Sequence, residues 1–559
     1  MKMKIGEFLL RRLRQIGVRH VFGVPGDFNL QLLEQFKTAG APEFIGTCNE
    51  LNASYAADGY ARVNGIGALL TTYGVGDLSA ICGLAGACAE HVPVVMISGT
   101  PPLFAMEARL RMHHSLAEGN FDNVRVCLHQ FTGASILLTP SNAAYELDRV
   151  LISCRRDRLP VCIQVPSNIT YLEIEVPDEE LCFTMPASDE ERLSSAVSRI
   201  CELLESSKSP VMLIDADADR CGLAHDLYTI AKRRQIPYAE FRAGKGTMPG
   251  TDALYQGLYS GDASSLEAVR STDCMIATAP CFSEASPMVV PQLLPVSASI
   301  FIRDKSVTIE GDVYEGVYAH ELVAELAKKI RPKGTQAPQP SEIAVKKPRA
   351  AAAGRTLTQS RFWECAEYFL KPNDLVCAEN GTSLTALGAM RFPRGVKFIA
   401  QPIWGSIGYS LPALLGVMSA APERRAVLFI GDGSFQLTAQ EWSTIVNRGL
   451  KPIVFLLNNG GYTIERYILG MNSAYNDIAN WKYTELARVF ASGKDCFCVS
   501  VKTEDELDAA MAEAEKCGKA SLIEVQLRPD DAPEALKTFC AMTAELDYGP
   551  RGPQRDNKR

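Results

Sequence analysis

Two polar segments that directly follow apolar runs contain the residue types best suited to chemistry. The apolar run 426–430 leads to Asp432, and the apolar run 453–457 leads to Asn459. Runs of this length predict buried strands. A carboxylate oxygen of Asp432, an amide oxygen of Asn459 and a backbone carbonyl near Gly461 are hard ligands of the kind that Mg²⁺ prefers. The two segments therefore predict a divalent-cation site, provided that the chain brings them together.

The segment between the two runs is predicted to do this. Apolar residues recur at helical spacing over 439–446, and Gly449 suits the position after a helix. A strand, a helix and a second strand make a βαβ unit, whose right-handed crossover puts both carboxyl ends at one edge of a sheet. Gly433 and Ser434, at the helix start, suit a phosphate oxygen. The unit predicts a site for a metal and a diphosphate; the alternative is an ordinary strand–turn–helix of an α/β protein.

Composition bounds the protein around this unit. The chain has 559 residues, which predicts three or four domains, and a net charge of −8 without a long basic run, which argues against nucleic-acid binding. No apolar stretch approaches a membrane span, and the N-terminus resembles an amphipathic helix rather than a secretion signal. Seventeen cysteines without a C-x-x-C pair predict free thiols in the cytoplasm; disulfides and zinc are the alternatives.

Strands and helices alternate along the chain, which indicates doubly wound parallel sheets. Predicted strands lie at 20–24, 69–72, 94–98, 211–214, 274–278 and 375–377, and predicted helices at 359–369 and 533–545. The helix that follows Glu50 is thin because it carries Ala53, Ala56, Ala57 and Gly59, so another backbone is expected to approach it closely.

Several motifs together resemble one family. They are Gly-Asp-Gly at 431–433 followed after 24 residues by Asn458-Asn459, CNELNASYAADGYAR at 48–62, GVPGDFN at 23–29 and Met-His-His-Ser-Leu at 112–116. They resemble the thiamine-diphosphate-dependent 2-oxo-acid decarboxylases, which include pyruvate, indolepyruvate, phenylpyruvate and branched-chain 2-oxo-acid decarboxylases. The resemblance covers about residues 3–545. It implies three doubly wound parallel-sheet domains of that family's type: a pyrimidine-binding domain (1–182), a central domain (188–331), a linker (332–355), and a diphosphate- and Mg-binding domain (356–559) with a C-terminal lid helix.

The resemblance also implies the catalytic residues. Glu50 would activate the cofactor by bonding to N1′ of its aminopyrimidine, although by position alone it is an ordinary first-turn acid. Asp27, His113 and His114 would handle proton transfers, although Asp27 could be a helix N-cap and the histidines a polar loop. Glu465 would lie beside the departing carboxylate, although it could equally be a surface helical acid.

The remaining site residues follow from the same resemblance. Ile407 would hold the two cofactor rings bent, although by spacing alone a core isoleucine is the better interpretation. The other expected cofactor contacts are Thr382, Gly405, Gly433, Ser434, Tyr462 and Ile464, and the expected metal ligands are Asp432, Asn459 and Gly461. The expected substrate pocket comprises Ala285, Leu384, Thr385, Ile468, Phe539 and Thr543, with Ile464 beside them.

The predicted function is non-oxidative decarboxylation of 2-oxo acids to aldehydes and CO₂, with thiamine diphosphate and Mg²⁺. The resemblance also implies a preference for larger aliphatic, branched or aromatic 2-oxo acids, because Ala285, Thr385 and Thr543 stand where members of the family can carry bulky aromatic residues. The alternatives are a pyruvate decarboxylase proper, a thiamine-diphosphate carboligase, and a cofactor-binding protein without turnover. The resemblance implies a dimer or tetramer with active sites between subunits.

Overall fold

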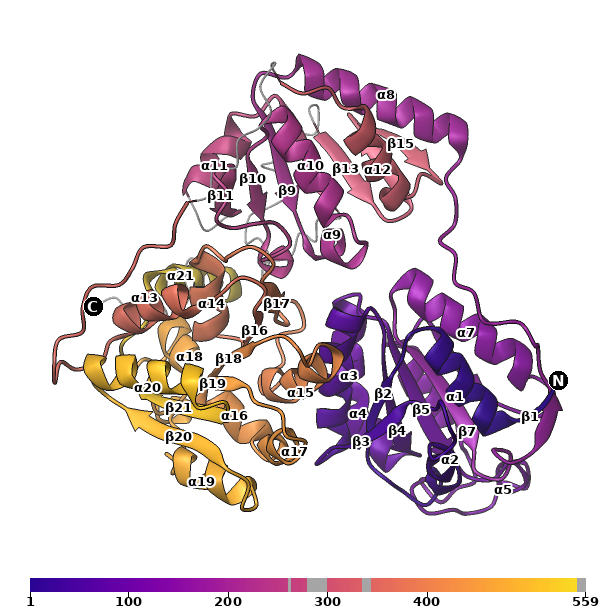
Figure 1. The fold of residues 1–559 in the computed structure, drawn as a ribbon. Helices are drawn as coiled ribbons and strands as arrows, with labels where there is room; N and C mark the ends of the chain where they lie inside the picture. The colour runs from indigo at the N-terminus through magenta and orange to yellow at the C-terminus, as the bar shows by residue number, and fades with distance from the viewer. Residues whose placement is uncertain (260–262, 279–298, 334–342, 550–559) are drawn as a thin grey trace.

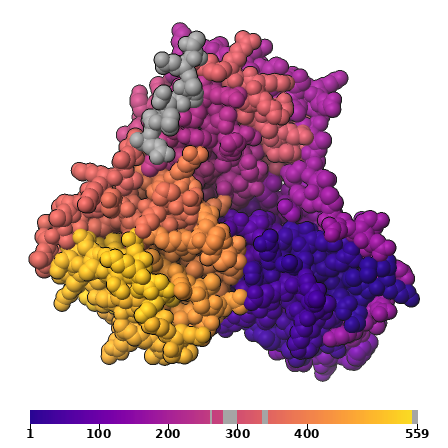
Figure 2. Space-filling view, in the orientation of Figure 1, coloured from indigo at the N-terminus to yellow at the C-terminus, as the bar shows by residue number. Residues whose placement is uncertain are grey.

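The computed structural model describes residues 1–259, 263–278, 299–333 and 343–549, and these form three lobes, each built around one sheet (Figure 1). The first third of the chain packs against the last third, and the middle third lies over both (Figure 2). Ala285 and residues 334–342 of the predicted linker lie outside the described residues. None of the described helices combines the length and apolar composition that crossing a lipid bilayer requires.

The first sheet is wholly parallel, in the order β3-β2-β4-β5-β7-β6. Its strands are Glu43–Gly46 (β3), His20–Gly23 (β2), Gly67–Thr72 (β4), Val94–Thr100 (β5), Val161–Pro166 (β7) and Ala134–Leu137 (β6). Its helices are Ile5–Gln15 (α1), Leu30–Gln35 (α2), Glu50–Asn64 (α3), Val75–Ala89 (α4), Leu103–Glu107 (α5), Asp122–His129 (α6) and Ala143–Asp157 (α7). A small antiparallel pair, β1 (Lys2–Lys4) with β8 (Glu173–Glu175), lies beside it. The three strands predicted in this part are confirmed.

The middle sheet is parallel over most of its width and ends in antiparallel strands. Its order is β11-β10-β9-β12-β13-β14-β15, where β14 and β15 run antiparallel to their neighbours. The strands are Tyr255–Leu258 (β11), Tyr238–Glu240 (β10), Pro210–Ile214 (β9), Cys274–Thr278 (β12), Ser299–Arg303 (β13), Ser306–Ile309 (β14) and Asp312–Glu315 (β15). The helices are Glu190–Ser206 (α8), Ala216–Arg220 (α9), Ala224–Arg234 (α10), Ala263–Arg270 (α11) and Ala319–Lys329 (α12), with a 3₁₀ turn, η1, at Arg242–Gly244.

The third sheet is again wholly parallel, in the order β17-β16-β18-β19-β21-β20. The strands are Lys397–Ile399 (β17), Leu375–Ala378 (β16), Ala426–Gly431 (β18), Ile453–Asn458 (β19), Ala520–Gln526 (β21) and Cys496–Val501 (β20). The helices are Gln359–Phe369 (α13), Thr382–Ala389 (α14), Ser410–Ala420 (α15), Asp432–Thr438 (α16), Glu441–Asn447 (α17), Thr463–Ile468 (α18), Tyr483–Phe490 (α19), Glu504–Lys516 (α20) and Glu534–Tyr548 (α21).

The predicted helix over 439–446 differs from what is observed. Helix begins already at Asp432, directly after β18, and is split into α16 and α17 by residues 439–440. Apolar spacing marks the face that packs on the sheet, and it does not register a break in the backbone hydrogen bonding. The expected βαβ unit is nevertheless confirmed, because β18 and β19 are parallel neighbours with Gly431 opposite Leu457.

The first and third lobes meet through α3 and α15, which pack backbone against backbone (Figure 1). A Cβ on Gly59 would lie 2.3 Å from the carbonyl oxygen of Ala413, and one on Gly416 would lie 1.8 Å from that of Ala56. The close approach predicted from the small residues of α3 is therefore confirmed. The sixteen described cysteines are all free thiols, as expected.

Candidate active site

Asp432 lies at the carboxyl end of β18 and is almost fully buried. Its Oδ2 accepts hydrogen bonds from the backbone N–H groups of Asn459 (3.2 Å), Gly460 (2.7 Å) and Gly461 (3.1 Å). Its Oδ1 accepts from the N–H of Gly433 at 2.8 Å. Burial raises the pKa of this carboxyl to about 6, against the effect of the four N–H donors. The side chain thus holds the turn after β19 in place.

Three oxygen atoms converge beside this turn. The side-chain oxygen of Asn459 points at the carbonyl oxygen of Gly461 (2.8 Å) and at Oδ1 of Asp432 (3.3 Å), and no donor lies between them. If the Asn459 side-chain amide were rotated by 180°, all three oxygen atoms would accept hydrogen bonds. In the orientation observed, a bound cation would compensate the three oxygens instead. Neighbouring ligands of an octahedral Mg²⁺ lie about 2.9 Å apart, as metal–oxygen bonds of 2.0–2.1 Å require. The donor set and its spacing fit Mg²⁺.

A buried arginine stiffens the same loop. Arg466 on α18 donates to the carbonyl oxygens of Gly460 (3.0 Å) and Asn459 (3.5 Å) and forms an ion pair with Asp477 (2.8 Å). Because its partners come from both sides of the turn, the turn cannot move without breaking several charge-assisted hydrogen bonds.

A cavity of about 270 Å³ opens next to the converging oxygens. Its wall contains all of the predicted cofactor and metal residues, namely Thr382, Gly405, Ile407, Asp432, Gly433, Ser434, Asn459, Gly461, Tyr462 and Ile464. Gly405 has φ +69°, in the region that favours glycine. Ile407 is 38% exposed and faces the cavity, so the core interpretation from spacing alone is wrong.

The predicted substrate residues are only partly brought together. Leu384, Thr385 and Phe539 line the cavity. Ile468 packs against α21 instead, and Thr543, on α21, is not part of the described cavity wall. Glu465 on α18 lines the cavity, and its pKa is raised by partial burial and by the charge of Asp547.

A second cluster lies at the edge of the first sheet. His113 Nε2 lies 2.8 Å from Oδ2 of Asp27, and His114 Nε2 lies 3.8 Å from Oδ1 of the same residue. The ring of His113 stacks on Phe28, with centroids 4.9 Å apart. The structure thus brings together the three residues expected to act on protons, and in one chain Asp27 and His113 are about half exposed.

Glu50 begins α3, where Asn49 is the N-cap. Its Oε1 lies close to the start of α4, since a Cβ on Gly76 would be 3.1 Å away. The neighbouring Asp77 is fully buried and accepts hydrogen bonds from Thr71 (2.6 Å) and the backbone of Gly74 (3.0 Å). Burial, with the charge of Glu50 adding to it, raises the pKa of Asp77 to about 6.

The two clusters do not share a cavity within one chain. All the described residues that line the cavity belong to 242–539, so neither Glu50 nor the Asp27 cluster contributes to it. The contacts between the first and last thirds lie elsewhere, for example Asn52 Nδ2 donating to Glu441 Oε2 at 2.7 Å.

Three residues at this junction were missed from the sequence. Glu379 follows β16 and is buried against the start of α15; its position after a buried strand was an available signal. Glu90 is buried and its Oε1 accepts from the N–H of Ile403 at 2.7 Å, in the loop that leads to Gly405. Arg242 reaches the cavity from the middle lobe. For Glu90 and Arg242 no local pattern exists, because their partners lie hundreds of residues away or on another lobe.

Comparison with known proteins agrees with this architecture. Residues 3–123 match the family described as thiamine pyrophosphate enzyme, N-terminal TPP binding domain; residues 197–310 match the central domain, and residues 380–525 match the C-terminal TPP binding domain. The fold and the sheet-edge site therefore define a thiamine-diphosphate enzyme.

Full-length relatives narrow the class. The chain is 35% identical to a pyruvate decarboxylase of Aspergillus fumigatus over 97% of this chain and 96% of that one. It is 34% identical to an alpha-keto-acid decarboxylase of Mycolicibacterium paratuberculosis (98% of each) and to a pyruvate decarboxylase of Hanseniaspora uvarum (98% and 99%). The chain belongs to the thiamine-diphosphate-dependent 2-oxo-acid decarboxylase family, and it is a carboxy-lyase.

Proposed function

We propose that this enzyme decarboxylates 2-oxo acids without oxidation, releasing an aldehyde and CO₂, and that it requires Mg²⁺ as well as thiamine diphosphate. Thiamine diphosphate, when bound, supplies a nucleophilic carbon and an electron sink. The observation that carries the metal requirement is that the Asp432 carboxylate, the Asn459 side-chain amide and the Gly461 carbonyl meet at one point of the cavity wall, a set of groups that offers hard oxygen ligands.

The cavity wall next to these oxygens suits the rest of the cofactor. Gly433 and Ser434 lie in the first turn of α16, and Thr382 begins α14, so the starts of two helices face the position of the phosphate oxygens. Ile407, exposed toward the cavity, and the carbonyl of Gly405 are placed to hold the ring system, with Tyr462 and Ile464 on the same wall.

The remaining catalytic groups come from a second copy of the chain. The cavity takes no described residue from the first lobe, whereas the proposed role of Glu50 requires contact with the cofactor ring. Apolar side chains near Glu50 are exposed in one chain, among them Val75 (55%) and Leu78 (49%) at the start of α4. Exposed apolar surface of this kind favours self-association. We infer a dimer or tetramer whose active sites lie between subunits.

In this arrangement each acid–base group has one role. Glu50 would hold a proton at the cofactor's N1′ position, and the Asp27–His113–His114 cluster would deliver a proton after CO₂ departs, because an imidazole beside a carboxylate can pass a proton on. Glu465, in a poorly solvated part of the cavity, disfavours the charged substrate carboxylate relative to neutral CO₂.

The substrate end of the cavity supports side chains larger than the methyl group of pyruvate. Thr385 is small, and the Ile468 and Thr543 side chains are not part of the cavity wall. No aromatic residue other than Tyr462 and Phe539 lines the cavity among the described residues.

One experiment separates the candidate functions. Aldehyde release is measured with pyruvate, phenylpyruvate and branched-chain 2-oxo acids, with and without Mg²⁺ and thiamine diphosphate. The proposal expects aldehyde only when both are present, and higher kcat/KM for the larger acids. Acetolactate-type condensation products in place of aldehyde would indicate a carboligase, and highest kcat/KM with pyruvate would indicate a pyruvate decarboxylase proper. Activity that survives complete removal of divalent metal would contradict the metal assignment.

A further inference from the structure

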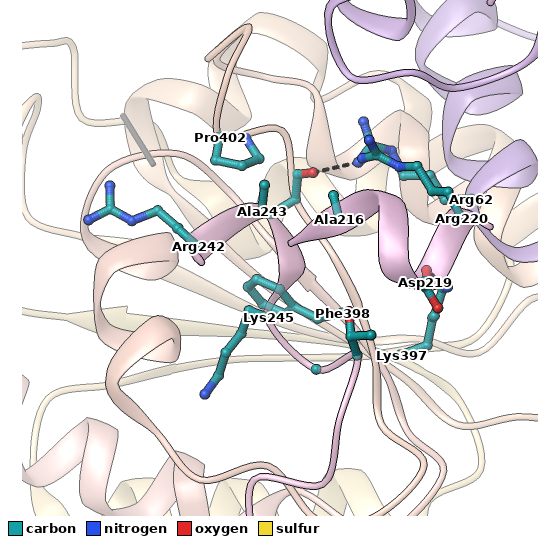
Figure 3. A pocket seen from close by; sticks show the side chains of 13 residues that line it. Arg62, Ala216, Asp219, Arg220, Arg242, Ala243, Lys245, Lys397, Phe398 and Pro402 are labelled. Atoms are coloured by element: carbon teal, nitrogen blue, oxygen red, sulfur yellow. Dashed lines mark hydrogen bonds and ion pairs between the residues drawn. The ribbon is translucent and has the colours of Figure 1, made fainter. Parts of the chain in front are cut away.

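Arg242 is the feature of the cavity that the decarboxylation chemistry does not use. It lies on η1, which follows β10 of the middle lobe, and it lines the same cavity as Thr382, Leu384 and Glu465. Its side chain points away from the cluster formed by Arg62, Arg220, Asp219 and Lys397 (Figure 3). The middle lobe thus extends one cationic side chain into a cavity otherwise built by the last third.

The cations of the neighbouring cluster each have a carboxylate partner. Arg62 pairs with Asp58 at 2.6 Å, Arg220 with Glu90 at 3.4 Å, and Lys397 with Asp219. These charges are therefore neutralised within the protein.

Arg242 differs from them. Among the residues that the structure describes, no carboxylate lies within 4.0 Å of its guanidinium. Its guanidinium carbon instead lies 4.4 Å from the ring centroid of Phe539 on α21. Burial lowers the pKa of Arg242 to about 10, which leaves the group charged at neutral pH. A cation partly withdrawn from water without a counter-ion is unfavourable, and a bound anion would relieve it.

The position of Arg242 indicates which anion this is. Arg242 packs on Phe539 of α21, and Glu465 lines the same cavity, yet the two side chains form no ion pair. Gly433, at the diphosphate end, is covered instead by the ring of Tyr462, which a Cβ on Gly433 would meet at 2.5 Å. Because it packs on Phe539, Arg242 lies at the end of the cavity where the substrate side chain is expected.

We propose that Arg242 binds a second anionic group at the far end of the substrate, so that the preferred substrate is a 2-oxo acid with a distal carboxylate. This inference rests on the proposed function and narrows it: the larger side chain that the cavity accepts ends in a charge. A guanidinium binds a carboxylate through two parallel N–H···O bonds, which an alkyl or phenyl group cannot replace.

A matched pair of substrates tests this inference. 2-Oxoglutarate and 5-methyl-2-oxohexanoate have the same chain length and nearly the same shape, but the second carries an isopropyl group in place of the distal carboxylate. We expect kcat/KM for 2-oxoglutarate to be higher by about tenfold or more. The isopropyl acid would leave the Arg242 guanidinium without its hydrogen-bonding partner, and a site built for a polar group strongly rejects an analogue that lacks it. Arg242→Met should lower kcat/KM for 2-oxoglutarate by about 10- to 100-fold and change that for the isopropyl acid by less than about threefold. Arg242→Lys should retain part of the preference, and Arg270→Met, an exposed arginine on α11, should leave both values unchanged.

Binding gives a readout independent of turnover. Calorimetric titration of the holoenzyme with 2-hydroxyglutarate should show binding that Arg242→Met abolishes, while thiamine diphosphate affinity stays the same. The inference is overturned if the isopropyl acid is the preferred substrate or if Arg242→Met weakens thiamine diphosphate binding instead. It is also overturned if Arg242→Met lowers kcat/KM equally for both substrates, which is the result expected if Arg242 only packs against Phe539. Failure of every 2-oxo acid to yield aldehyde would overturn the proposed function, whereas the titration would still decide whether Arg242 binds a dicarboxylate.

Discussion

The buried carboxylate of Glu379 accepts hydrogen bonds from both the hydroxyl and the backbone N–H of Ser410, at 2.6 and 3.2 Å. Its other oxygen accepts from the N–H of Asn380 at 3.0 Å. One side chain therefore ties the end of β16 to the start of α15. The loop that carries Gly405 and Ile407 ends at this tie, so Glu379 fixes one end of a cavity wall.

The burial of this carboxylate predicts a pH dependence of stability. Burial raises the pKa of Glu379 to about 7, against an ordinary value near 4.5. The folded state therefore holds the proton more tightly than the unfolded chain does. The resulting stabilisation is complete below about pH 4.5 and is lost as the pH rises through 7. The largest effect that such a shift allows is roughly 3 kcal/mol.

The measurement is thermal unfolding of the wild type and of Glu379→Gln between pH 5 and pH 8. The wild type should lose more of its free energy of unfolding across this range than the variant, whose amide does not titrate. Asp432 and Asp77 also titrate with raised pKa values, but they contribute equally to both proteins. Parallel profiles would show that Glu379 does not titrate in this range.

Asp432→Asn should remove the metal site. The substitution replaces a charged ligand of the three-oxygen set by a neutral one, so we expect Mg²⁺-dependent binding of thiamine diphosphate to weaken by about 100-fold. Calorimetry with the diphosphate at fixed Mg²⁺ measures this. Asp530→Asn, at an exposed position, is the control. Unchanged cofactor affinity in Asp432→Asn would place the metal elsewhere.

Two inactive variants should restore activity when they are mixed in one oligomer. Glu50→Gln and Asp432→Asn damage different halves of the proposed site. In a randomly mixed dimer population, about a quarter of the sites combine an intact half from each chain, if the halves come from different copies. Co-expression of two differently tagged chains and assay of the purified mixture should give about a quarter of the wild-type activity. No recovery in oligomers shown to be mixed would refute the shared site.

Glu465→Gln should slow decarboxylation without loss of the cofactor. We expect kcat to fall by about 100-fold while thiamine diphosphate affinity changes by less than about twofold, because the side chain lies toward the substrate end of the cavity. Asp547→Asn should shift the acidic limb of the pH–rate profile downward, since the charge of Asp547 helps to raise the pKa of Glu465. Equal losses of turnover and cofactor binding in Glu465→Gln would contradict the proposed role.

Gly416→Ala should destabilise the contact between α3 and α15. The new methyl group would lie 1.8 Å from the carbonyl oxygen of Ala56, so the helices must separate, at a cost of roughly 3 kcal/mol or more. Gly46→Ala adds the same methyl group where no atom lies within 4 Å and serves as the control. Chemical denaturation measures both, and similar stabilities would mean that the helices adjust freely.

The residues at the ends of the strands could be predicted from the sequence, whereas the contacts between the lobes could not. Asp432 and Asn459 were predictable because parallel strands place their carboxyl ends together, whatever the rest of the chain does. Arg242 and Glu90 were not, because their positions depend on how separate lobes pack. Ile407 was misjudged from spacing, since apolar character predicts burial and says nothing of a residue kept exposed toward a cavity.

Several expectations from the sequence stay predictions. The domain limits at 182, 331 and 355, the placement of Ala285 and the roles assigned to individual residues depend on the family resemblance. The split between α16 and α17 shows a different limit, since periodicity locates the buried face of a helix better than its ends.

The backbone contact between α3 and α15 sets a fixed distance inside each protomer. Main-chain atoms, unlike side chains, have no alternative rotamers or sizes, so mutations in the surrounding core leave this spacing almost unaltered. In the proposed oligomer, each protomer would then keep a constant distance between the residues that it contributes to a neighbour's active site and its own cavity. Engineering of this enzyme can therefore vary the crevice lining extensively without resetting the geometry of assembly, as long as the glycines of these two helices are kept.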